Sequence, residues 1–300
     1  MQHFDSLQAF HEYMQWPAPE HPMLSLISLD SNEMPHRKSS PPITNDCYMI
    51  VLKRVIKGDM TYGRTRLDFS NGAMLFFAPG QSIEWQEVEV EQRGFMINIH
   101  KDYSKTTHLA DRIKTYGYFS YAVNEALHLS PKEETTVISF YENIESEYHN
   151  NQDEHSKEII VGLLDTMLKY ADRFYKRQFI NRKEMNSDLG FQMQKVLVQY
   201  FESGNFKQQG APGIDWVANQ LHVSPRYLSD ALKAETGKTA KDHIHLFLID
   251  EAKNLLLESG KTIAEVAYQL GFEYPQYFSR LFKKKVGMSP KQYQESQKLH

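Results

Sequence analysis

The 300-residue sequence predicts an α+β chain, with an N-terminal antiparallel β-roll or barrel carrying packed helices and an all-α domain after it. Three changes of pattern predict this class. Apolar residues recur with period two or in short runs from about residue 24 to 100, they recur every three to four residues after Pro131, and every segment after Asp188 fits a helix. Because single cores seldom grow beyond about 250–300 residues, two domains are expected.

Composition is that of an ordinary globular protein, with 41% hydrophobic and 24% charged residues. No apolar run approaches the roughly 18 residues that span a bilayer, and the N-terminus lacks the pattern of a signal peptide. A single cysteine, Cys47, leaves no intrachain disulfide and no cysteine-based zinc site. We therefore expect a cytoplasmic protein without membrane contact, in which Cys47, beside "YMIVL", is a buried strand thiol.

The β region contains the segments "LSLISL", "YMIVLKRVI", "AMLFFA" and "GFMINIH", with turn signals at Asn71-Gly72 and Pro79-Gly80. Short strands joined by hairpins, with no helix pattern between them, favour a barrel or a double-sheet roll. The aromatic side chains of this region fit two roles equally well, the lining of an apolar pocket or an ordinary barrel core. They are Phe69, Phe76, Phe77, Trp85 and Phe95.

Two amphipathic helices are predicted after the sheet, in "PKEETTVISFYENIESEYHN" and "HSKEIIVGLLDTMLKYADRFYKRQF". The apolar stripe of the second is wide enough to serve both a domain core and a partner subunit. The polar stretch 176–187 has little to bury and is the predicted linker. It separates an N-terminal domain, 1–175, from a C-terminal domain, 188–300.

An internal repeat marks the C-terminal domain. "VANQLHVS-PRYLSDALK" (217–233) aligns with "VAYQLGFEYPQYFSRLFK" (266–283), at an offset of 49 that becomes 50 after the turn. Thr262 and Glu265 form a capping box, Gly271 supplies a positive φ, and Pro275 suits the first turn of the next helix. The first copy has Ser224-Pro225 at the equivalent helix start and His222 in the place of Gly271. Each copy is therefore a predicted helix-turn-helix.

The second helix of each copy has an apolar and a polar face. The apolar faces hold Leu228, Ala231 and Leu232 in the first copy and Phe278, Leu281 and Phe282 in the second. The polar faces hold Arg226, Ser229, Asp230 and Lys233, and Gln276, Ser279, Arg280 and Lys283. Such side chains bond base edges and phosphates, although a plain solvated face would show the same periodicity.

Net charge gives this interpretation little support, because residues 186–300 hold 14 Lys and Arg against 12 Asp and Glu. The DNA-binding interpretation therefore depends on where the cations lie and not on their number. The segment "AKDHIHLFLIDEAKNLLLESG" between the copies predicts one long helix, a rigid connection between the two recognition helices. Two such helices on one face of a duplex occupy major-groove segments about 34 Å apart, and another separation requires bent DNA.

With these residues placed, the chain resembles the AraC/XylS-type transcriptional regulators. "TIAEVAYQLGFEYPQYFSRLFKKKVGMSPKQY" (262–293) matches that family's signature almost throughout, and residues 24–175 are similar in layout to its cupin-like sensing and dimerisation domain. The resemblance implies a sequence-specific regulator with double-stranded DNA, a small-molecule effector, a second copy of the chain and RNA polymerase as partners. It implies no cofactor.

Residue by residue, the resemblance places base reading on Arg226, Ser229, Asp230, Gln276, Ser279 and Arg280. Expected phosphate contacts are Lys233, Lys241, Lys283, Lys284 and Lys291. Asp230 departs from the family, which commonly has a basic or amide side chain there. A carboxylate repels phosphate and can only accept a hydrogen bond, for instance from cytosine N4, so the first reader is expected to be weaker or more selective.

The rival hypothesis is a metal-dependent enzyme, because β-rolls of this kind also hold metal centres built from clustered His and carboxylate ligands. The sheet region offers only His36 and His100, and the pair His243 and His245 falls on the predicted long helix with its rings pointing apart. A cupin-type enzyme fused to a helical domain is therefore the disfavoured alternative. A membrane-surface helix at 274–290 is disfavoured too, since its apolar face is needed for the helix-turn-helix core.

Overall fold

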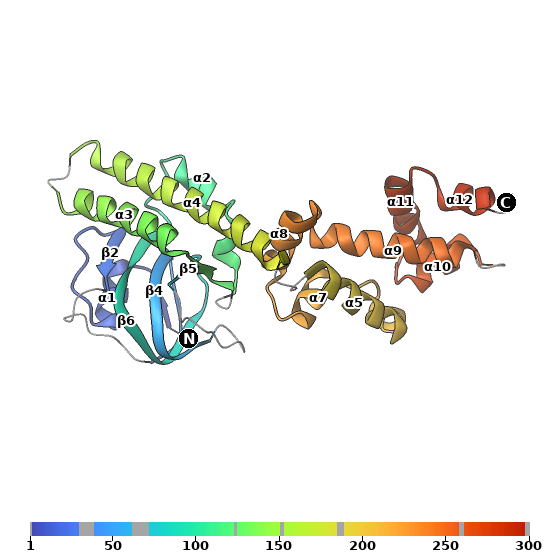
Figure 1. The fold of residues 1–300 in the computed structure, drawn as a ribbon, viewed down its shortest axis with the longest axis horizontal. Helices are drawn as coiled ribbons and strands as arrows, with labels where there is room; N and C mark the ends of the chain where they lie inside the picture. The colour runs from blue at the N-terminus through green and yellow to red at the C-terminus, as the bar shows by residue number, and fades with distance from the viewer. Residues whose placement is uncertain are drawn as a thin grey trace. The chain divides into compact units, whose positions relative to one another are not determined.

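The computed structural model describes residues 2–29, 39–61, 72–122, 125–150, 153–184, 189–257 and 261–297. It confirms a mixed α+β chain, with a sheet and helices in the N-terminal part and helices alone in the C-terminal part (Figure 1). Contacts divide the chain into two compact units, Met1–Gln178 and Phe179–His300. Within the predicted linker, residues 176–184 are helical.

One sheet organises the first unit. Among the described residues, its strands follow the order β1-β3-β6-β4-β5-β7, and β2 also pairs with β6. The strands are β1 (Gln2–Phe4), β2 (Leu24–Ser28), β3 (Ser40–Asn45), β4 (Cys47–Thr61), β5 (Ala73–Phe77), β6 (Ile83–His100) and β7 (Leu127–His128). The predicted turn at Pro79-Gly80 lies between β5 and β6, with φ +79° at Gly80. Asn71 and Phe69 lie outside the described residues.

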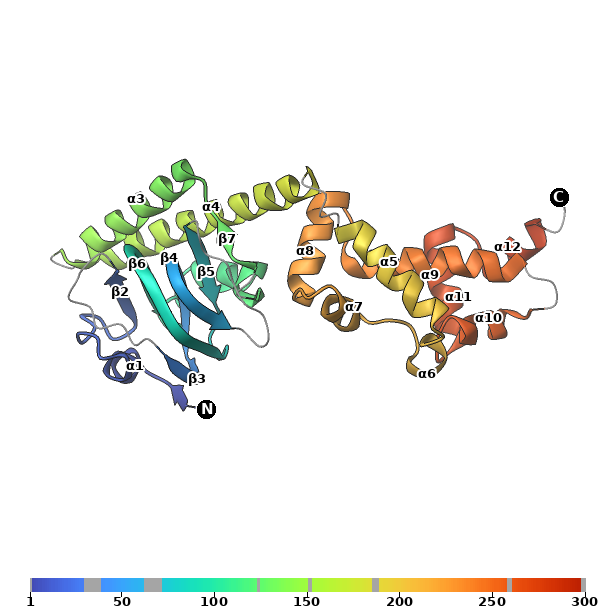
Figure 2. The same cartoon turned by 60° about the horizontal axis from the view of Figure 1, so that its bottom comes forward.

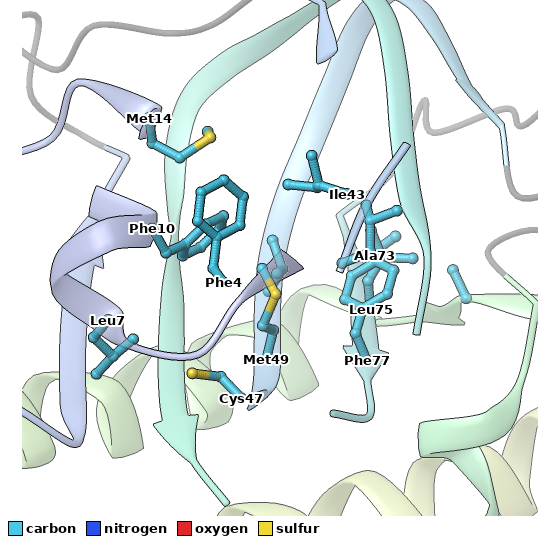
Figure 3. Close-up of a cluster of buried hydrophobic side chains, with 13 residues drawn as sticks. Phe4, Leu7, Phe10, Met14, Ile43, Cys47, Met49, Ala73, Leu75 and Phe77 are labelled. Atoms are coloured by element: carbon cyan, nitrogen blue, oxygen red, sulfur yellow. The ribbon is translucent and has the colours of Figure 1, made fainter. Parts of the chain in front are cut away.

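The inner face of the sheet packs around α1 (Leu7–Met14), a helix that the periodicity did not predict. Met49 lies opposite Phe77 on β5, and residues opposite each other share a face of the sheet. Figure 3 shows the resulting cluster, in which α1 closes over the strands. Its buried members are Phe4, Leu7, Phe10, Met14, Ile43, Cys47, Met49, Val51, Ala73, Leu75, Phe77, Ile83 and Ala126.

The outer face is covered by α3 (Pro131–Tyr148) and α4 (Ser156–Glu184), as Figure 2 shows. Phe95 stacks on Tyr141 of α3 with ring centroids 4.3 Å apart, and Phe76 lies 6.2 Å from Tyr175 of α4. Because neighbouring strand residues point to opposite faces, Phe76 and Phe77 serve different cores. These aromatic side chains therefore do not line a single pocket. The short helices α2 (Leu109–Ile113) and η1 (Gly117–Ser120) precede α3.

Among the described residues, the strands between 24 and 100 pair antiparallel as expected, whereas β1, which the sequence pattern did not predict, runs parallel to β3 at one edge. Gln2 pairs with Ile43, so this contact joins segments far apart in the sequence and leaves no local signal. Cys47 is confirmed as a buried strand thiol, and burial raises its pKa to about 12. Lys53 was not singled out in the sequence, but it is buried on β4 and burial lowers its pKa to about 8.

In the second unit, the residues that the structure describes after the end of α4 form helices and their connections. The helices are α5 (Leu189–Glu202), α6 (Phe206–Gln209), α7 (Ile214–Gln220), α8 (Pro225–Thr236), α9 (Ala240–Leu257), α10 (Ile263–Gln269), α11 (Pro275–Val286) and α12 (Pro290–Gln297). The long helix α9 packs against members of both helix pairs, with α7 and α8 near one of its ends and α10 and α11 near the other (Figure 1). Within the described ranges, no helix combines the length and apolar character that crossing a membrane requires.

Candidate nucleic-acid interface

The first helix pair is α7 and α8, and its turn has the local chemistry expected from the sequence. Ser224 caps α8, because its hydroxyl accepts a hydrogen bond from the Tyr227 amide at 3.2 Å, and Pro225 follows in the first turn. His222 takes the left-handed conformation at φ +55°. The apolar face of α8 is buried as predicted, through Leu228, Ala231 and Leu232, together with Tyr227.

The second pair is α10 and α11. Thr262 and Glu265 form the predicted capping box, with the Glu265 amide donating to the Thr262 hydroxyl at 3.2 Å and the Thr262 amide donating to the Glu265 carboxylate at 2.7 Å. Phe278 and Phe282 are fully buried, whereas Leu281 is only partly buried. Both predicted helix-turn-helix motifs are present.

Gly271 ends α10 at φ +78°, and the segment before α7 passes close to it. Its carbonyl oxygen accepts a hydrogen bond from the Ala211 amide at 3.2 Å. A Cβ atom at position 271 would overlap the Ala211 nitrogen and lie 2.5 Å from the carbonyl carbon of Gly210. This glycine therefore joins the second helix pair to the segment that leads into the first.

The start of α9 is tied to the recognition helix of the second pair. Asp242 accepts a hydrogen bond from Lys285 of α11 at 2.9 Å and another from the Thr239 hydroxyl at 2.8 Å. These two donors, Lys285 first, hold the pKa of Asp242 below its ordinary value. The ion pair thus joins the C-terminal end of α11 to the first turn of α9.

The predicted base-reading side chains lie on the faces of α8 and α11 turned away from the buried residues. Arg226, Gln276 and Arg280 are exposed, whereas Ser229, Asp230 and Ser279 are half-buried. The predicted phosphate-binding lysines are all exposed. They are Lys233, Lys241, Lys283, Lys284 and Lys291.

Arg226 and Asp230 form an ion pair one helical turn apart on α8, with the Arg226 Nε donating to the Asp230 Oδ2 at 2.9 Å. The Arg226 side chain is 52% exposed and the Asp230 side chain 28%. The sequence alone predicted two separate base readers at these positions. Their spacing of four residues was the signal that would have paired them.

Among the described residues, Arg280 on α11 packs on an aromatic ring instead of binding a carboxylate. Its guanidinium lies over the ring of Tyr277, 5.8 Å from the centroid, and Tyr274 meets the same ring edge-on at 5.7 Å. Tyr277 is 55% exposed, although Tyr227, at the equivalent position of the repeat, is fully buried. Phe179 packs against Tyr227 at 5.2 Å between ring centroids, so one copy of this tyrosine belongs to the core and the other to the surface.

The residues described by the structure contain no group of three or more His, Cys, Asp or Glu side chains placed to hold a metal ion. His243 donates or accepts a hydrogen bond at 2.8 Å from the Thr236 hydroxyl, which gives it a local partner at the end of α8. His36 lies outside the described residues.

Comparison with known proteins gives matches in this C-terminal region. A family model described as a helix-turn-helix domain matches residues 217–296, which include both helix pairs. An uncharacterized HTH-type transcriptional regulator in the cgkA 5' region of Pseudoalteromonas carrageenovora is 39% identical over 83 residues, or 28% of this chain and 49% of that protein. The uncharacterized HTH-type transcriptional regulator YobQ of Bacillus subtilis is 36% identical over 25% of this chain and 31% of its own length.

The HTH-type transcriptional activator RhaS of Escherichia coli is 32% identical over 83 residues, covering 27% of this chain and 30% of its own length. These matches thus span less than half of each relative. Among solved structures, the C-terminal domain of AraT, a response regulator from Geobacillus stearothermophilus, is 31% identical over 37% of this chain and 86% of that chain, with a TM-score of 0.32. The sequence matches and the two helix pairs together identify the C-terminal region of this chain as a helix-turn-helix domain of the AraC/XylS type.

Proposed function

We propose that this protein is a transcriptional regulator that binds specific sites on double-stranded DNA. One observation carries the proposal. Two helix-turn-helix pairs share α9, and the second helix of each pair turns a polar, partly cationic face to solvent. Recognition helices in this arrangement read neighbouring segments of the major groove, about one helical turn apart.

Specificity on α11 is assigned to Gln276, Ser279 and Arg280, and on α8 to Arg226 and Ser229. A guanidinium suits the two acceptors of guanine, and an amide suits adenine. The exposed lysines at positions 233, 241, 283, 284 and 291 are assigned to phosphates, where they set the register of the protein on the duplex. Lys285 is not included, because it is bound to Asp242.

For the N-terminal unit, we propose a cupin-like roll, within residues 1–175, that serves effector binding, dimerisation or both. The support for these roles is the resemblance of residues 24–175 in layout to the sensing and dimerisation domain of the AraC/XylS-type regulators. On this proposal the protein acts by binding in the cytoplasm and not by catalysis. An effector would shift the balance between arrangements of the two recognition helices.

The proposal is tested by selection of bound sequences from a random double-stranded DNA pool, using the full-length protein. We expect two short motifs on one face of the duplex, about one helical turn apart, and binding that weakens steeply as salt rises. A variant in which both Arg226 and Arg280 are alanine should enrich neither motif while keeping the fold. Failure of the wild-type protein to enrich any sequence over the input pool would refute the proposal.

A further inference from the structure

We propose that Asp230 is a positioning residue that holds Arg226 for guanine recognition, and that it does not itself read a base. The inference rests on the proposed function. It resolves the conflict that the sequence raises, in which a carboxylate stands on a helix face meant for phosphates and base edges. The geometry of α8 supplies the reason.

The carboxylate of Asp230 binds the inner nitrogen of the guanidinium. The 2.9 Å hydrogen bond from the Arg226 Nε leaves both terminal amino groups of Arg226 available, and no other partner of Arg226 occurs in the described part of the chain. These two amino groups form the fork that can donate to the O6 and N7 of one guanine. Asp230 thus binds the Nε of Arg226, the donor that is not needed when the two terminal amino groups contact guanine.

Holding the side chain lowers the conformational cost of binding. A free arginine loses rotamer entropy when it is immobilised, and a carboxylate that restrains it beforehand reduces that loss. The ion pair also cancels the charge of Asp230 at the place where phosphates approach. A carboxylate that is 28% exposed and already bound to a guanidinium offers a poor acceptor for cytosine.

The repeat makes the assignment specific to α8. Position 230 corresponds to Arg280 in the second copy, and Arg226 corresponds to Gln276. The arginine of α8 therefore sits one turn nearer the start of its helix than the arginine of α11, which has Tyr277 for its support. The two recognition helices should place their preferred guanines at different points of their half-sites.

The test compares full-length wild type with Asp230→Ala, Asp230→Asn, Arg226→Ala and the double alanine variant, in pool selection and in affinity for the selected site. We expect Asp230→Ala to weaken specific binding about fivefold or more and to relax the same base position that Arg226→Ala relaxes. The double variant should bind like Arg226→Ala alone. Asp230→Asn should recover part of the preference, since an amide oxygen still accepts from Nε.

Two outcomes would overturn the inference. If Asp230→Ala relaxes a different base position and its effect adds to that of Arg226→Ala, Asp230 reads a base itself. If Asp230→Ala tightens binding to all sequences alike, the carboxylate acts by repelling phosphate. Asp250→Ala, which removes the same charge from α9, is the matched control and should leave the selected sequence unchanged. If the wild-type protein itself selects no sequence from the pool, the proposed function is refuted, and this inference with it.

Discussion

Replacing Gly271 with alanine should destabilise the second helix pair far more than a left-handed residue alone explains. An L-residue held at φ +78° costs about 1–2 kcal/mol. The added Cβ would also collide with backbone atoms of Gly210 and Ala211, which no side-chain rotation can relieve. Forcing backbone apart in a packed region adds about 1–3 kcal/mol, so the expected total is about 2–5 kcal/mol.

Gly287→Ala is the matched control. Gly287 ends α11 at φ +88°, but an added Cβ there has no neighbour within 4 Å. It should therefore show only the conformational cost of about 1–2 kcal/mol. Both glycines end helices of the same pair, so the difference between the two variants isolates the close approach of residues 210–211.

Amide hydrogen exchange of the full-length protein, followed on peptides from α10 and α11, measures both effects in one experiment. At about 1.4 kcal/mol per tenfold change, exchange should accelerate up to about 30-fold for Gly287→Ala and by a further factor of about 5 to 150 for Gly271→Ala. Equal acceleration in the two variants would show that the segment before α7 yields at no cost. Residues 210–211 would then not restrain position 271.

The other predictions concern the reading face, α4 and α9. Arg280→Ala should cost about 1–3 kcal/mol of specific binding and relax preference at one base, as measured by competition with single-base variants of the selected site. Tyr277→Ala should weaken that same preference, whereas Tyr277→Phe keeps the ring beneath the guanidinium and should retain it. Gly162→Ala should stabilise α4 by about 0.5–1 kcal/mol in urea unfolding, because the added methyl group meets open space in a helix. Asp242 has a folded pKa below its unfolded value, so its contribution is present above the ordinary carboxyl pKa of about 3.9 and is lost as pH falls through the lower folded value. Urea midpoints for wild type and Asp242→Asn should therefore differ at pH 6 and converge in acid.

Much of the C-terminal domain could be predicted from the sequence because its signals are local. The capping box at Thr262, the Ser224-Pro225 start of α8 and the left-handed Gly271 each depend on residues within one turn, and all three occur as expected. The polar and apolar faces of α8 and α11 follow from the helical period in the same way.

Contacts between distant segments escaped prediction. Tyr227 and Tyr277 have the same residue type at the same place in the repeat, yet only Tyr227 has Phe179 against it, so one is buried and the other exposed. The parallel pairing of β1 with β3 likewise depends on a partner some forty residues away. The Arg226–Asp230 pair is the instructive case, since its spacing was visible in the sequence and only its geometry showed which nitrogen the carboxylate binds.

On the proposed function, the sharing of α9 by both helix pairs constrains how the protein and its DNA sites can change over time. Inserting one residue into an α-helix turns everything beyond it by about 100° and moves it by about 1.5 Å, so α9 cannot gain or lose a residue without swinging one recognition helix off its groove. Substitutions on the reading faces of α8 and α11 carry no such penalty. Divergent copies of this protein should therefore keep the spacing between their two half-sites while the bases within each half-site drift.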